Sequence, residues 1–445
     1  MNRPGITYRH PPHNGIDART SRLRRRNRAA VLLRLMTGAV LFIVCVHRAS
    51  AFQLVELHHA DSLMGRVLPT GEDVRELSGR VHFSQGNVRV WCDRAIQYLS
   101  KNEFELIGSV KVIRDTVTLT SRYGRYFGTT KQAYCEQGVK LETKHVTLFA
   151  DRGTYYTEER RAFFQDHVRI IDSTSTIDCD ELTYYEVERK SIAHAHVTIT
   201  NSENSIRMYG GHLDHYDQTH YSKLSIDPKM VQIDTSAEGK IDTLTVRSLV
   251  MESYSDSTRR LIATDSVTIV RSELSARGGL VRYDTRGEEI ELHKKPIVWY
   301  EEHQVTGDTI LIYLAHRRLD HAVVRGHAFA LSLSDTAYPG RYNQLSGRLL
   351  TLTFREQKIS QTVVERNAVS LYFLYDGRTP NGVNKTSGDY ISMAFKSGKP
   401  DIIRVKKGIE GIYYPEPMVK RNTQAYNLDG FVLRTDRPSI QRQSL

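Results

Sequence analysis

The sequence predicts an all-β protein, an elongated solenoid in which about ten repeats of roughly 29 residues stack into one folded-over sheet. Three observations predict this class. An apolar pair returns at a fixed step of 29 residues, the neighbours of that pair are mostly polar, and the apolar spacing of an amphipathic helix is not found after the N-terminal segment.

The repeat is anchored by apolar pairs whose members stand two residues apart. The first five anchors are Val81/Phe83, Val110/Val112, Val139/Leu141, Val168/Ile170 and Val197/Ile199. Polar neighbours such as Arg80 and His82 make this alternation typical of a strand with one dry and one wet face. A second apolar pair, a Tyr and a third apolar segment follow in each unit, so we expect three or four short strands per unit.

The register loosens after Asn201, which divides the chain. We expect a signal peptide over 1–51, regular repeats over 52–200, irregular repeats with insertions over 201–266, a second repeat block over 267–415 and a C-terminal tail over 416–445. The later anchors are predicted at Val231/Ile233, Val267/Ile269, Ile297/Trp299, Ala328/Ala330 and Ala368/Ser370.

A unit of this size cannot bury its apolar face alone. Stacked units merge their dry faces into one interior, and each end of the stack leaves unpaired backbone N–H and C=O groups. Those two ends must be capped, paired or made repellent.

The basic N-terminus has its own explanation. Residues 1–51 hold ten Arg and one acid, so the rest of the chain carries a net charge of only +2, which gives no electrostatic footprint for nucleic acid. The apolar run from Leu35 to Val46, followed by Ala49-Ser50-Ala51, predicts a cleavable signal peptide. An uncleaved membrane anchor is the alternative.

The three cysteines after this segment do not suggest a disulfide or a metal site. Cys92 and Cys179 occupy the same slot three repeats apart, and Cys135 occupies another slot. We expect all three to be buried as small hydrophobic residues.

Polar motifs that could carry chemistry have simpler interpretations. The stretch from His212 to His220 (HLDHYDQTH) fits a solvated loop better than a metal site, and His194 and His196 fit the wet face of a strand. Asp93, Asp151 and Asp180 recur once per unit, whereas catalysis needs one constellation, so a turn or strand-end role is favoured. We therefore expect no enzyme activity, no catalytic residues, no metal and no cofactor.

A series of tyrosines favours packing in the interior. Its members are Tyr126, Tyr155, Tyr184, Tyr254, Tyr283 and Tyr313. A second interpretation is an apolar wall whose hydroxyl tips reach solvent.

Several stretches resemble the repeat of the OstA-like, or organic-solvent-tolerance, family. They are LSGRVHF (77–83), WCDRAIQY (91–98), FELIGSVKV (104–112), DCDELTYY (178–185), KPIVWYEEHQVTGDTILIYL (295–314), NQLSGRLLTLTF (343–354) and KTSGDYISMAF (385–395). The chain differs from the short members in having more than twice their usual number of repeats. Members of this family include the periplasmic bridge protein of lipopolysaccharide transport.

The resemblance implies a β-jellyroll, or β-taco, of antiparallel strands with an apolar groove for the acyl chains of lipopolysaccharide. The side chains expected to line that groove are Val81, Phe83, Val110, Val112, Val139, Leu141, Val168, Ile170, Val197 and Ile199. The implied location is the periplasm. The implied partners are the jellyroll component of the inner-membrane transporter and the outer-membrane translocon, joined by edge-strand pairing, with a homo-oligomer as a further expectation.

Two other classes of function stay open at this point. One is a structural or adhesive β-solenoid with a closed interior. The other, less favoured, is a β-helix enzyme that acts on polysaccharide.

Overall fold

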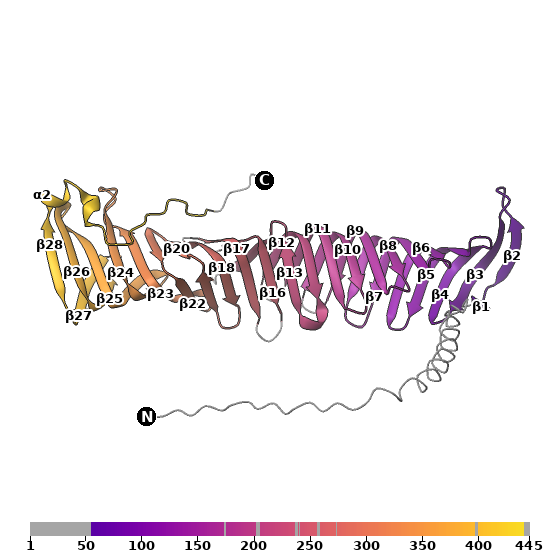
Figure 1. The fold of residues 1–445 in the computed structure, drawn as a ribbon. Helices are drawn as coiled ribbons and strands as arrows, with labels where there is room; N and C mark the ends of the chain where they lie inside the picture. The colour runs from indigo at the N-terminus through magenta and orange to yellow at the C-terminus, as the bar shows by residue number, and fades with distance from the viewer. Residues whose placement is uncertain are drawn as a thin grey trace, which may run out of the picture. The chain divides into compact units, whose positions relative to one another are not determined.

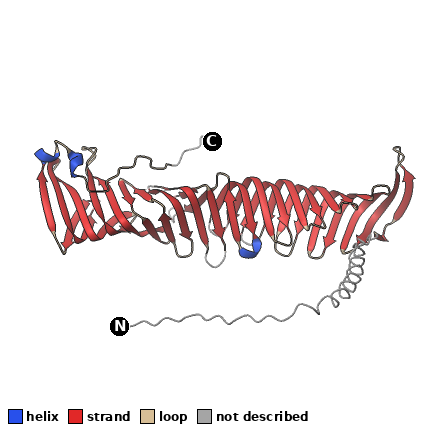
Figure 2. Cartoon of the chain, viewed as in Figure 1, coloured by secondary structure: helices blue, strands red, loops and turns tan. Residues whose placement is uncertain are grey.

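The computed structural model describes residues 55–439 apart from 173–174, 202–204, 236–238, 240, 256–258, 273 and 397–398. The described residues form one antiparallel sheet of 28 strands, with only short helical turns (Figures 1 and 2). The predicted all-β, antiparallel fold is confirmed. The predicted signal peptide lies outside the described residues.

Most strands pair with the strand before and the strand after them in the chain, and where a long strand is split in two, both parts pair with the same neighbouring strand or strands. The strands of the first half are β1 (Glu56–His59), β2 (Ser62–Val67), β3 (Asp73–Gln85), β4 (Val88–Tyr98), β5 (Glu103–Arg114), β6 (Val117–Phe127), β7 (Gln132–Glu142), β8 (Thr147–Tyr156), β9 (Arg161–Ile171), β10 (Ser175–Tyr185), β11 (Lys190–Asn201), β12 (Ile206–Tyr216), β13 (Tyr221–Ser225) and β14 (Lys229–Thr235). Those of the second half are β15 (Ile241–Arg247), β16 (Val250–Tyr254), β17 (Arg260–Arg271), β18 (Leu274–Asp284), β19 (Glu289–His293), β20 (Ile297–Tyr300), β21 (His303–Thr306), β22 (Thr309–Ala315), β23 (Arg318–Leu333), β24 (Tyr342–Arg355), β25 (Lys358–Asp376), β26 (Thr379–Lys396), β27 (Lys399–Lys406) and β28 (Glu410–Pro415). Helix α2 (Glu416–Val419) and two 3₁₀ turns, η1 (Asp217–Thr219) and η2 (Thr423–Tyr426), complete the described elements.

Each regular repeat contains two long strands, so the prediction of three or four short strands is wrong. In β5, for example, the third apolar segment of one unit (104–106) and the anchor of the next (110–112) belong to one strand of 12 residues. The sequence pattern breaks between them because the strand bends there, while its hydrogen bonding to both neighbours resumes after the bend.

The bend is a pair of consecutive residues with positive φ, which we call the crease. In β3 these are Gly79 (φ 79°) and Arg80 (φ 48°), and they oppose the single residue Asp93 in β4, as in a β-bulge. Apart from two pairs in hairpin turns, 316/317 and 356/357, eleven such pairs occur in the described residues, and the first five recur every 29 residues: 79/80, 108/109, 137/138, 166/167 and 195/196. The crease therefore sets the period of the repeat.

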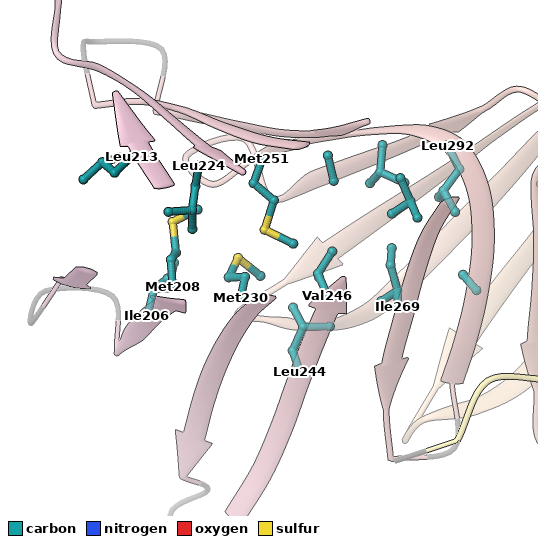
Figure 3. Close-up of a cluster of buried hydrophobic side chains, with 14 of the residues drawn as sticks. Ile206, Met208, Leu213, Leu224, Met230, Leu244, Val246, Met251, Ile269 and Leu292 are labelled. Carbon is teal, nitrogen blue, oxygen red and sulfur yellow. The ribbon is translucent and has the colours of Figure 1, made fainter. Parts of the chain in front are cut away.

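The creases divide the folded sheet into two walls. The first wall contains the strand halves on the anchor side, such as 81–85 and 110–114, and the second contains the other halves, such as 94–98 and 103–107. We call the hairpin turns along the open edge of each wall the first rim and the second rim. Apolar side chains of the two walls face each other and form one core cluster, part of which appears in Figure 3.

The crease also explains two incorrect anchors. Each anchor begins directly after a crease, and the creases at 226/227 and 294/295 are followed by the buried prolines Pro228 and Pro296. The inward pairs there are Pro228/Met230 and Pro296/Val298. The predicted pair Val231/Ile233 starts three positions late and the predicted pair Ile297/Trp299 starts one position late. A shift by an odd number of residues places a side chain on the other face of the strand.

The irregular region keeps the same ladder. Around 226/227 and 248/249 the long strand is split in two, giving β13/β14 and β15/β16, but β12 pairs with β13 and β14 and β17 pairs with β15 and β16. Pairing is thus continuous from 52–200 into 267–415. The division into these blocks stays a prediction.

Residues 416–439, which we call the strap, lie on the outer face of the first wall. Val419 and Leu428 are buried with Phe329 and Leu331 in a cluster separate from the main core, whereas Ala328, next to Phe329, contacts the main core. The strap therefore covers the side of β23 that faces away from the interior. Figure 1 shows this segment running back from α2 along the sheet.

Polar contacts fix the strap along the second repeat block. The side-chain amide of Gln304 donates to the Val432 carbonyl (2.7 Å) and accepts from the Arg434 N–H (2.8 Å). Farther back, the Ser275 hydroxyl donates to the Pro438 carbonyl (2.9 Å). Trp299, on the same outer face, is only 5% exposed. In the described part of the chain, no helix has the length and apolarity needed to span a bilayer.

Candidate functional site

The ten side chains predicted to line a groove all lie in or against the apolar interior. Eight of them are at most 6% exposed, and Val112 and Ile199 are partly buried against the core cluster. Most of this interior forms one cluster that runs from Val117 to Met393. Whether these side chains contact a lipid stays a prediction.

Aromatic contacts fill the interior near its N-terminal end. The Phe83 and Phe104 rings, from the first and second wall, lie 5.1 Å apart, and the Phe104 and Tyr126 rings lie 6.5 Å apart. Farther along, the fully buried Phe164 packs where a side chain on Gly153 would stand. The absence of a Cβ at Gly153 thus makes room for an aromatic ring.

Four members of the tyrosine series occupy the second wall with their rings inward. These are Tyr126, Tyr155, Tyr184 and Tyr283. Tyr313 does not join them, because Ile310 and Ile312 are the inward side chains of β22. Tyr254, at the end of β16, lines a cavity between the rims, where the Arg260 guanidinium lies 5.4 Å from the centre of its ring.

The tips of the inward tyrosines hydrogen-bond at the rims. The Tyr126 hydroxyl donates to Gln85 Oε1 across the opening (2.6 Å), and the Tyr155 hydroxyl donates to Glu186 Oε2 (2.8 Å). Burial, and then the hydrogen bond to Glu186, raise the pKa of Tyr155 to about 12. An apolar wall with polar tips is therefore the better of the two interpretations for Tyr126 and Tyr155.

Arg114 and Tyr300 also connect the rims. Arg114 Nη1 lies 3.3 Å from the Tyr155 hydroxyl and donates to the Thr157 carbonyl, and the Tyr300 hydroxyl donates to the Gln357 carbonyl. The two walls are thus tied together at several points along the opening.

The interior is not equally filled along its length. Between Phe83 and Thr157 the remaining cavity has a volume of about 40 Å³. A cavity of about 560 Å³ lies between the rims near Lys144 and Arg260, and one of about 350 Å³ lies in the second block near Val298 and Met393. Space for a ligand is therefore present in the middle and the second block, whereas the N-terminal part must open to receive one.

The recurring aspartates have a structural position at the crease. Asp151 Oδ2 lies 2.8 Å from His167 Nδ1, and Asp180 Oδ2 lies 2.7 Å from His196 Nδ1. Asp93 packs against Gly108, the first crease residue of β5. These carboxylates are spread along the outside of the sheet in three repeats, with Arg122 in the same place in a fourth, and do not converge in a cleft.

The His-rich stretch is more ordered than predicted. His212 and His215 lie in β12, and the stretch ends in the 3₁₀ turn η1, so only its end is a loop. His212 Nδ1 approaches His194 Nδ1 (3.2 Å) and His212 Nε2 approaches Asp214 (3.2 Å). Within the described residues, no three His, Cys, Asp or Glu side chains are arranged to hold a metal ion.

Cys92, Cys135 and Cys179 are free and buried, as predicted. Burial raises the pKa of the Cys135 thiol to about 11 and that of Cys92 to about 12. All three are therefore protonated and unreactive at neutral pH.

Two structural features of the candidate site and its surroundings were not predicted from the sequence. One is the methionine group Met208, Met230 and Met251, which lines the interior of the irregular region (Figure 3). The other is the order of the strap. The two prolines that follow creases could have corrected the anchor near Met230, but the outward aromatic residues under the strap carry no distinct sequence signal.

These features define a class: a folded antiparallel sheet whose two walls enclose an apolar interior, with hydrogen bonds between its rims and, in the described part of the chain, edge strands at both ends. Residues 52–209 match the family of OstA-like proteins. The resemblance is thereby confirmed for this part of the chain, and the family match agrees with the expectation that the chain is not an enzyme.

Other comparisons add little to this match. No curated protein matches the chain. One similar solved structure is that of LptH, titled the LptA homologous periplasmic component of the conserved lipopolysaccharide transport device from Pseudomonas aeruginosa. It is 10% identical, covers 34% of this chain and 82% of its own, and has a TM-score of 0.18, so it carries no conclusion about function.

Proposed function

We propose that this protein is a periplasmic component of lipopolysaccharide transport that shields acyl chains in its apolar interior and passes them from the inner to the outer membrane. The continuity of the apolar core along the sheet supports the proposal. Each exposed CH₂ group costs about 0.8 kcal/mol in water, and a continuous apolar path avoids that cost at every step of the route. The OstA-like match and the predicted signal peptide agree with this role.

Transport by this route requires the walls to separate. The cavity near Phe83 is far too small for an acyl chain, so loading must displace core side chains and release contacts such as Tyr126–Gln85. The rim contacts are hydrogen bonds and therefore reversible at modest cost.

The ends of the sheet supply surfaces for partners. Among the residues that the structure describes, β1 and β2 pair only with β3, and β27 and β28 pair only with β26. These edge strands expose apolar side chains, which are Leu57, Leu63, Met64 and Val67 at one end and Ile402, Ile403, Ile412 and Tyr413 at the other. Strand addition to such edges would join the inner-membrane transporter jellyroll, the outer-membrane translocon or further copies of the chain.

Photo-crosslinking tests the transport role. A photoreactive residue at Phe83 or Ile170, both inward, should give adducts with lipopolysaccharide in cells. A matched probe at Arg169, the exposed outward neighbour of Ile170, should give none. Equal labelling from inward and outward positions, or none from either, would contradict the proposal.

A closed structural β-solenoid is the second candidate. The observation that favours it is the tight packing of the N-terminal part of the interior. A bound lipid recovered from the purified protein would exclude it.

A further inference from the structure

The cavity of about 560 Å³ in the middle of the chain differs chemically from the rest of the interior. Both rims line it. The first rim contributes Lys144, His145 and Asp172, and the second contributes Arg189, Asp217, His220, Arg259 and Arg260. We call this cavity the central site.

Below these polar groups the central site has an apolar floor. Its members are Ile177, Ile199, Ile206, Met208 and Leu261. Met208 and Leu261 also line the adjoining interior together with Met230 and Met251. Figure 3 shows Met208 and Met230 on one wall and Met251 opposite them. Methionine side chains are flexible and adapt to ligands of irregular shape, so this floor can accommodate an acyl chain.

The mouth of the central site carries an excess of positive charge. Four basic side chains, Lys144, Arg189, Arg259 and Arg260, face two carboxylates. Both carboxylates have partners, because Asp217 accepts from Arg189 Nε (2.9 Å) and Asp172 accepts from the N–H and hydroxyl of Ser175 (2.7 and 2.8 Å).

Lys144 is the most available of these cations. It is exposed, and among the described residues it forms no ion pair. The neighbouring His215 adds no charge at neutral pH, because burial lowers its pKa.

The cavity in the second block provides an internal comparison. It is also lined by apolar residues of both walls, but its charged lining residues include Glu301 and Glu302 and no Lys or Arg. Positive charge above an apolar floor therefore distinguishes the central site from the cavity of the second block.

We propose that the central site binds the phosphate groups of a phosphorylated lipid while an acyl chain of the same molecule lies on the methionine-lined floor. This rests on the proposed function and adds to it the place where an anionic headgroup is held. Lipopolysaccharide and glycerophospholipid both carry this chemistry, and the experiment distinguishes them.

Binding of three probes by the full-length purified protein tests this site. The probes are lipopolysaccharide, the same lipopolysaccharide after enzymatic dephosphorylation, and phosphatidylglycerol in micelles. The site variant is Lys144→Gln/Arg260→Gln, and the control is Arg122→Gln/Arg348→Gln, which removes the same charge from two exposed positions at the creases. Circular dichroism confirms that each variant is folded.

The site variant should bind phosphorylated lipid roughly ten to a hundred times more weakly, as expected for the loss of charge-assisted hydrogen bonds, while the control binds as the unaltered protein does. Dephosphorylated lipid should bind all three proteins alike. Whichever of lipopolysaccharide and phosphatidylglycerol binds the unaltered protein more tightly is the lipid class whose phosphate the site holds. If the site variant does not fold, the salt dependence of binding by the unaltered protein replaces it, and only phosphorylated lipid should bind more weakly as salt rises.

Two results would overturn the proposal, and they differ in what else they overturn. If the site variant binds phosphorylated lipid as well as the control does, or if salt has no effect, the headgroup site is wrong while transport through the interior stands. If the unaltered protein binds no lipid of any kind, both the headgroup site and the proposed function fail.

Discussion

Arg114 and Tyr155 stand 41 residues apart in the sequence, yet Arg114 Nη1 lies 3.3 Å from the Tyr155 hydroxyl oxygen across the opening of the interior. Arg114 ends β5 at the first rim, and Tyr155 comes from the second wall. This contact is therefore one of those that hold the two walls together.

Replacing Arg114 with Ala should loosen the opening. The Arg114 side chain is only 18% exposed and also donates to the Thr157 carbonyl, so its loss should lower the free energy of unfolding by about 1–2 kcal/mol. Urea denaturation followed by circular dichroism measures this. Lys111→Ala, at an exposed outward position of the same strand, is the control, and equal effects of the two changes would show that Arg114 ties nothing together.

Alkaline pH should destabilise the same region. Burial and the Glu186 hydrogen bond raise the pKa of Tyr155 from its ordinary value of 10.0 to about 12, so the folded state favours the neutral phenol. The stabilisation is fully present below pH 10 and is lost as pH rises through about 12. Unfolding midpoints at pH 9 and pH 11.5 should differ less in Tyr155→Phe than in the unaltered protein. The same pH dependence in Tyr155→Phe and in the unaltered protein would show that Tyr155 does not cause the loss of stability at alkaline pH.

Phe164 should be among the most sensitive core positions. It is 1% exposed and packs against Gly153, so Phe164→Ala should cost about 3–5 kcal/mol by leaving a cavity. Phe149, on the outward face of β8 and 37% exposed, provides a control with the same chemistry. Thermal unfolding should separate the two variants clearly, and similar midpoints would mean that the interior repacks.

The crease predicts different costs for two glycines. Gly108 (φ 73°) and Gly138 (φ 83°) both have left-handed backbones, so either change to Ala should cost about 1 kcal/mol. A Cβ on Gly108 would in addition collide with the Asp93 side chain, whereas nothing lies within 4 Å of one on Gly138.

Gly108→Ala should therefore destabilise the protein more than Gly138→Ala. The additional change Asp93→Ala should abolish most of the difference. Chemical denaturation of the three variants tests this, and a larger effect at Gly138 would refute the account of the crease.

The strap should detach when Gln304 is replaced. Gln304→Ala removes both hydrogen bonds to residues 432 and 434, and limited proteolysis should then cleave within 427–439 at lower protease concentration. Gln361→Ala, at an exposed position of β25, should leave the cleavage rate unchanged. If Gln304→Ala is cleaved no faster than the unaltered protein, the apolar contacts of Val419 and Leu428 are enough to hold the strap in place.

Much of the fold could be predicted from the local periodicity of the sequence. The 29-residue step of anchors such as Val81 and Val110 was readable because each inward strand half alternates with period two. The crease was not readable, because residues as different as Gly79, Asp166 and Ala195 occupy its first position. Where a proline occupies the first position after the crease, as at Pro228, the apolar pattern no longer shows which side chains face inward.

The interior itself was easier to predict than its contents. All ten predicted groove residues face inward or pack against the core, because burial follows directly from the anchor pattern. The sizes of the cavities and the rim contact between Gln85 and Tyr126 depend on how two distant turns meet, which no local pattern encodes.

Every strand pairs with strands that lie close to it in the sequence, so the ladder can grow in the order in which the chain is made, each hairpin providing an edge for the next. The strap cannot follow that order, since Pro438 reaches back 163 residues to Ser275. The strap can therefore dock only after the strands beneath it have formed. A chain truncated after Pro415 would keep all the described strands and lose the contacts of the strap.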